Sequence, residues 1–144
     1  MKSLLAEPPE SGIPGQPLRV AQIMGKMDCG GVEAVVMNYY RALDKSNVQF
    51  DFFVDKTSSF PQRAEIERLG GRVFLVPPYS HVLSYLGALI HLFRKNQYRV
   101  VHAHTNTMNA FPLFAAWFAG VPVRVCHNHS TANWGEGLKT LAKY

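Results

Sequence analysis

Several features that would assign this chain of 144 residues to a particular class of protein are scarce or absent. It has only two cysteines, Cys29 and Cys126, and no CxxC pair, which excludes a disulfide framework and fits a reducing cytoplasm. No stretch approaches the roughly 18 uninterrupted apolar residues that a membrane span needs. The longest candidate, residues 82–93, contains His91 and is followed by two basic residues.

Acidic residues are missing from almost half of the chain. Between Arg68 and Gly135 there is no Asp or Glu, whereas all six histidines lie there, and the net charge is +5 at pH 7. A basic surface suits anionic ligands such as nucleotides, phospholipid head groups or diphosphates, and it equally serves solubility. The basic residues of the later half are scattered and form no aromatic–basic platform, which argues against nucleic acid as a partner.

The chain divides into a leader and one domain. Residues 1–17 contain four prolines and two glycines without apolar periodicity, which predicts a disordered leader. The apolar run at residues 4–6 is too short for the core of a secretory signal, so we expect a cytoplasmic protein. Residues 18–144 suffice for a single domain with its own core.

From residue 18 onward, apolar runs typical of strands alternate with stretches of helical periodicity. Strands are predicted at residues 18–24, 50–54, 73–76, 98–104 and 121–126. Helices are predicted at residues 32–43 and 82–95, and a short one follows the capping stretch 58–61 and ends at residue 69. Two more are predicted from the N-cap Asn109 to Gly120 and from residue 135 to the chain end. Apolar strands joined by helices form parallel sheets, so the predicted fold is α/β, a Rossmann-like doubly wound parallel sheet. We expect the domain to be truncated at its C-terminal end, because the last helix stops after about two turns.

In such a sheet, ligands bind beyond the carboxyl ends of the strands. The first polar segment predicted there is the loop at residues 25–31, whose last two residues, Gly30 and Gly31, precede a helix. Unobstructed backbone N–H groups and the positive end of a helix suit an anion. Taken alone, the glycine pair favours a tight turn without a ligand, because it forms neither a P-loop nor a dinucleotide fingerprint.

Four histidines follow two predicted strands at the same edge. His102 and His104 end the fourth strand, and His127 and His129 end the fifth. Residues two apart in an extended chain share a face. If the two strands are neighbours, up to four imidazoles converge on one crevice.

Two other functions remain open at this point. The paired HxH spacing is workable for a metal-dependent hydrolase, because imidazole is a common metal ligand. The acid-free stretch supplies no carboxylate to complete or orient such a site, so we expect no metal ligands. The alternative is a free-standing nucleotide- or anion-binding α/β module that uses the glycine loop.

Four short motifs, in this order and spacing, resemble those of a known family. They are GGVE at residues 30–33, LGG at 69–71, YRVVHAH at 98–104 and GVPVRVCHNHS at 120–130. The chain resembles the GT4-type glycosyltransferases of GT-B fold, and the last motif is especially like their capsular and exopolysaccharide branch. In the third motif, Tyr98 and Arg99 replace the Pro-Asp that is usual in the family.

The resemblance implies an enzyme of two Rossmann-like domains facing each other across a cleft. The C-terminal domain grips a nucleotide-sugar, and the N-terminal domain mainly binds the acceptor. Transfer to a glycan or lipid-linked acceptor retains the anomeric configuration and uses no cofactor besides the nucleotide-sugar co-substrate. This chain would be the N-terminal domain, with the C-terminal donor domain missing, and we expect it to be inactive by itself.

The resemblance also implies roles for particular residues. Gly30 and Gly31 would approach the donor diphosphate, and His127 or His129 would be the catalytic-site histidine near the transferred sugar. The acceptor side would hold His102, His104, Asn106 and Asn109. A lipid-linked acceptor would place the protein at the inner membrane face, with residues 79–94 either a peripheral membrane contact or an ordinary core helix.

Overall fold

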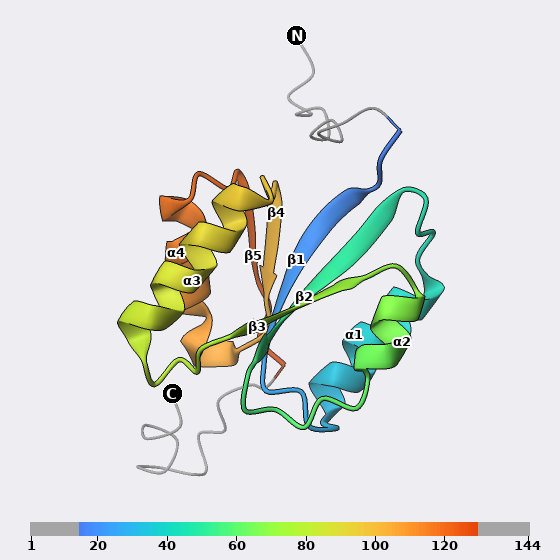
Figure 1. Cartoon of the computed structure of the whole chain (residues 1–144), viewed down its shortest axis with the longest axis horizontal. Coiled ribbons are helices and arrows are strands. Elements are labelled where there is room, and N and C mark those ends of the chain that lie inside the picture. Colours follow the sequence, from blue (N-terminus) through green and yellow to red (C-terminus); the bar gives the residue numbers. More distant parts are fainter. Residues whose placement is uncertain (1–14, 130–144) are drawn as a thin grey trace, which may run out of the picture.

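The computed structural model of the protein describes residues 15–129. Most of the predicted leader and the helix predicted from residue 135 lie outside these residues. The described chain forms one five-stranded sheet with helices on both faces (Figure 1). None of its helices is long and apolar enough to cross a membrane.

All strand pairs are parallel, and the strand order is β3-β2-β1-β4-β5. The strands are β1 (Leu18–Gly25), β2 (Val48–Asp55), β3 (Arg72–Val76), β4 (Val100–Ala103) and β5 (Val123–Cys126). The helices are α1 (Gly31–Ala42), α2 (Arg63–Arg68), α3 (Val82–Lys95) and α4 (Ala110–Phe118), with a 3-10 turn η1 (Asn106–Asn109) before α4. The predicted α/β, Rossmann-like fold is therefore confirmed, and it is consistent with the N-terminal half of a GT-B fold.

Alternation along β1 divides the core into two layers. Ala21 and Ile23 belong to the cluster that includes residues of α3 and α4, whereas Met24 belongs to the cluster with α1 and α2. Figure 1 shows the same division, with α1 and α2 on one side of the sheet and α3 and α4 on the other. Two apolar layers of this kind account for the near-continuous hydrophobicity of the strands.

A buried carboxylate ties the strands together. Asp51 on β2 is fully buried and accepts hydrogen bonds from Arg19, Arg72 and Tyr98, each at 2.6 Å. Burial, and next the Asp51 charge, raises the pKa of Tyr98, so its hydroxyl stays protonated and donates. Loss of these partners would leave the buried Asp51 carboxylate uncompensated, which destabilises a folded protein. The network therefore stabilises the sheet.

Candidate functional site at the carboxyl edge of the sheet

Parallel pairing places the loops after β1, β4 and β5 at one edge of the sheet. The strand order reverses between β1 and β4, which is the usual place for a ligand crevice in an open α/β sheet. His102 on β4 lies beside Gln22 on β1 and Val125 on β5 in the strand register. The structure therefore brings the predicted histidine segments to the point of reversal.

The four imidazoles form one cluster, as the sequence predicted. Ring centroids are 4.0 Å apart for His102 and His104 and 4.1 Å apart for His127 and His129. Across the two strands, His102 and His127 lie 5.4 Å apart, and His104 and His129 lie 5.2 Å apart. Backbone hydrogen bonds fix two of these positions: His104 N donates to the Ile23 carbonyl and His127 N to the Ala103 carbonyl, both at 2.9 Å.

Gln22 orients the cluster from β1. Its Oε1 lies 2.7 Å from Nε2 of His104, and Nδ1 of His104 lies 2.9 Å from Nε2 of His129. Because an amide oxygen only accepts, Nε2 of His104 carries the proton and its Nδ1 presents a lone pair to the cluster. Nε2 of His102 is buried without a hydrogen-bond partner among the described residues.

The imidazoles in the interior of this cluster are neutral at pH 7. Burial, reinforced by the neighbouring histidines, lowers the pKa of His102 to about 4 and that of His104 to about 3. Burial also lowers the pKa of His129, and the Glu33 charge partly opposes this. The site therefore offers N–H donors and lone pairs rather than fixed positive charges.

A cavity of about 220 Å³ lies between α1 and the sheet face that carries the imidazoles. Its lining combines apolar side chains with three imidazoles and one amide: Gln22, Val35, Val36, Tyr39, Leu43, Phe50, His102, His104 and His127. Sequence reasoning missed Gln22 and the apolar wall. The available signal for Gln22 was a single amide in the otherwise apolar run of residues 20–24.

The glycine pair lies at the same edge but outside that cavity lining. Gly30 is the N-cap of α1, and Gly31 is its first residue, and both are exposed. The carboxylate of Glu33 turns back beside Gly30, where an added Cβ would lie 2.6 Å from Glu33 Oε2. The glycine pair and the histidine cavity are thus separate subsites at one edge of the sheet, because the cavity faces later turns of α1.

Two asparagines connect β4 to the segment after β5. Asn106 accepts a hydrogen bond from His129 N at 2.9 Å. Asn109 is 2% exposed; its Oδ1 accepts from Thr105 N at 2.7 Å and its Nδ2 donates to the His127 carbonyl at 3.1 Å. Asn109 occupies the predicted N-cap position of α4, yet its side chain bonds across the site instead of capping the helix.

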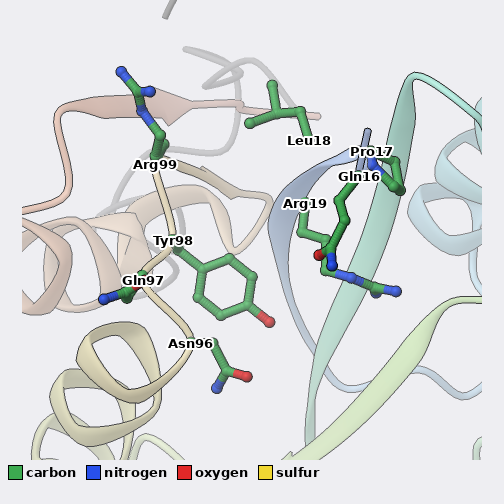
Figure 2. Close-up of a pocket in the computed structure, with 8 residues that line it drawn as sticks. All are labelled: Gln16, Pro17, Leu18, Arg19, Asn96, Gln97, Tyr98 and Arg99. Carbon is green, nitrogen blue, oxygen red and sulfur yellow. The ribbon is translucent and has the colours of Figure 1, made fainter. Parts of the chain in front are cut away.

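Another cavity, of about 120 Å³, lies at the opposite edge of the sheet, where β1 and β4 begin (Figure 2). Its lining consists of Gln16, Pro17, Leu18, Arg19, Asn96, Gln97, Tyr98 and Arg99. Ligands of open α/β sheets bind beyond the carboxyl ends of the strands. We therefore place the candidate site at the histidine cluster.

The fold and this site define a Rossmann-like α/β domain with a ligand crevice at its strand-order reversal. Residues 30–143 match the model of the family described as "Glycosyl transferase 4-like domain", and the chain belongs to that family. It is 41% identical to EpsF of Bacillus subtilis (strain 168), whose name assigns it provisionally to the glycosyltransferases. That match covers 85% of this chain and 34% of EpsF, so the chain spans about a third of that relative. No solved structure matches the chain.

Proposed function

We propose that this domain is the acceptor-side half of a retaining glycosyltransferase that moves a sugar from a nucleotide-sugar to a glycan or lipid-linked acceptor. The observation that carries the proposal is one sheet edge holding both a glycine-opened helix and four imidazoles. Family membership supports the reaction class. The resemblance to the polysaccharide branch supports a growing glycan as the acceptor, and a second domain would grip the donor.

The donor diphosphate binds at the start of α1. Departure of the sugar leaves negative charge on the diphosphate, and a helix N-terminus stabilises that charge without reorganising. Gly30 and Gly31 are exposed and carry no side chains of their own, so a phosphate reaches the backbone N–H groups once the Glu33 carboxylate beside Gly30 turns away. In this role the helix end takes the part that a metal ion plays in other transferases.

The imidazoles bind sugar hydroxyls. A neutral ring donates from one nitrogen and accepts at the other, which matches a hydroxyl. His127 or His129 lies near the transferred sugar as the catalytic-site histidine, and His102 and His104 face the acceptor with Asn106. Asn109 is buried and bonded across the site, so we assign it the positioning of the two strand ends.

A lipid-linked acceptor requires contact with a membrane surface, and we propose that α4 makes it. Phe114, Trp117 and Phe118 of α4 are 50%, 60% and 53% exposed. The Arg94 guanidinium lies 5.3 Å from the ring centre of Phe118. Aromatic side chains beside a cation suit an anionic membrane interface. In residues 79–94, for which the sequence left a membrane contact or an ordinary core helix open, Leu83 is 87% exposed, while Tyr85 and Leu89 of α3 face the core.

The substitution Gly31→Pro tests the donor subsite. Proline is tolerated at the first helical position, and the extended conformation of Gly30 (φ −93°, ψ 178°) is compatible with a following proline, so one N–H donor is lost while the helix remains. We expect the KM for the nucleotide-sugar to rise about tenfold or more in the full-length protein, because a hydrogen bond to a charged group is lost.

Gly31→Ala is the matched control. It retains the N–H, and its added Cβ meets no atom within 4 Å in the described part of the chain. Equal KM values for Gly31→Pro and Gly31→Ala would contradict binding of the donor diphosphate at this helix end. Nucleotide binding without sugar transfer, over a panel of nucleotide-sugars, would favour a free-standing binding module instead.

A further inference from the structure

Three imidazoles of the cluster are close enough to share one ion. His102, His104 and His127 each place a ring nitrogen within 4.8 Å of the other two. We propose that these three histidines form a binding site for a divalent transition-metal ion of the zinc class. From the sequence alone no metal ligands were expected, because the acid-free stretch around these histidines supplies no carboxylate.

Binding one ion requires the ring nitrogens of His102, His104 and His127, which lie within 4.8 Å of one another, to draw closer. Zinc–nitrogen bonds of 2.0–2.1 Å in a tetrahedral site place ligand nitrogens roughly 3.3 Å apart. Because the rings of His102 and His127 are stacked within 8° of parallel, at least one of them must rotate to direct its in-plane lone pair at the shared ion. His129 Nε2, at 2.9 Å from His104 Nδ1, lies where a fourth ligand could bind. The buried Nε2 of His102 has no partner in the described structure, and a bound ion is one way to satisfy such a group.

Gln22 supplies the orientation that a carboxylate gives in other metal sites. Metal-bound histidines usually donate their second N–H to a carboxylate or carbonyl oxygen, which fixes the tautomer and the ring orientation. Here the acceptor is Gln22 Oε1, 2.7 Å from His104 Nε2, and it is itself 2% exposed. His104 Nδ1 is thereby left as the ligand atom facing the cluster. The lack of local acidic residues is therefore no obstacle.

The donor set selects the class of metal. Neutral imidazoles suit Zn²⁺, Cu²⁺ and Ni²⁺, whereas Mg²⁺ and Ca²⁺ prefer oxygen ligands. Within the described residues, the group that could hold an ion consists of three histidines and no carboxylate. Three protein ligands leave a fourth position, which His129 or a molecule in the adjoining cavity can fill.

Binding of an ion would affect the site described above. It would use the imidazole lone pairs that otherwise accept hydrogen bonds from sugar hydroxyls, so metal and acceptor would compete. This consequence rests on the proposed function, whereas metal binding itself does not. A measurement of metal binding therefore tests the metal site independently of the proposed sugar transfer.

The test is titration of untagged, chelator-stripped protein with Zn²⁺ and with Co²⁺, followed by calorimetry and visible absorption. We expect one equivalent of Zn²⁺ with a Kd in the micromolar range or below, a Co²⁺ absorption band, and no heat with Mg²⁺. His102→Ala and His127→Ala should each lower the affinity at least tenfold. Gln22→Leu should lower it about tenfold to a hundredfold through loss of ring orientation.

His91→Ala is the control, because His91 is exposed on α3 and lies outside the cluster. It should leave the affinity unchanged. Circular dichroism identifies any variant that does not fold, and His127→Ala at the half-buried strand end serves if His102→Ala unfolds. Absence of saturable Zn²⁺ binding, or equal affinity in the folded His127→Ala and wild-type proteins, would overturn the proposal.

Discussion

Two glycines of this chain, Gly71 and Gly87, have opposite effects on stability because their surroundings differ. At Gly71 an added Cβ would lie 2.7 Å from the hydroxyl of Tyr40 and 2.9 Å from the backbone carbonyl of Phe50. Gly87, in the middle of α3, is exposed, and an added Cβ there meets no described atom within 4 Å. Gly71 therefore permits close packing of α2 and β3 against the core, whereas Gly87 only weakens its helix.

The two positions give a paired prediction for stability. Gly71→Ala should lower the free energy of unfolding by about 1–3 kcal/mol, because backbone must move to admit the methyl group. Gly87→Ala should raise it by about 0.5–1 kcal/mol through the better helix propensity of alanine. Urea unfolding followed by circular dichroism measures both. A loss of stability at Gly87, or none at Gly71, would contradict the described packing.

The convergence of the histidines could be predicted from the sequence, whereas their partners could not. Alternation in strands and the parallel arrangement bring His102, His104 and His127 together once β4 and β5 are neighbours, which the sequence left as a condition and the structure supplies. Gln22 bonds His104 across 82 residues, and Asp51 bonds Tyr98 across 47. No local pattern encodes such pairs, because they depend on strand order and register.

The elements themselves were predicted well where periodicity is strong. Residues 82–95 form α3 with the predicted bounds. The fourth and fifth strands are shorter than predicted, at Val100–Ala103 and Val123–Cys126. The apolar and aromatic residues just before these two strands have other roles than strand pairing. Tyr98 donates a hydrogen bond to Asp51, and Val121 donates its N–H to the Ala116 carbonyl at the end of α4.

The exposed aromatic face of α4 gives a prediction at this scale. If α4 contacts a membrane, Trp117→Ser should reduce cosedimentation with anionic phospholipid vesicles at least fivefold, because the amphipathic ring is lost from the interface. Tyr39→Ser is the control, since Tyr39 is 66% exposed on α1, on the other face of the sheet. Equal loss in both variants, or no vesicle binding by the wild-type protein, would assign α4 another role.

The whole molecule places its chemistry where its topology reverses. The sheet separates the α1–α2 face from the α3–α4 face, and parallel pairing places the loops that follow β1 and β4 at one edge (Figure 1). The start of α1 supplies backbone N–H groups for an anion, while β4 and the segment after β5 supply imidazoles. The proposed transferase needs both, because the leaving diphosphate and the reacting sugar are neighbours in the substrate.

The most direct test of this account is sugar transfer by the full-length protein with His127→Ala and His129→Ala, assayed from nucleotide-sugars in the presence of a chelator. The account predicts that at least one variant loses about a hundredfold or more in kcat, in the range of a positioned proton-transfer or hydrogen-bonding group. The control, His91→Ala on α3, should retain wild-type kcat. Wild-type turnover in both His127→Ala and His129→Ala would contradict the assignment of the histidine cluster as the catalytic site.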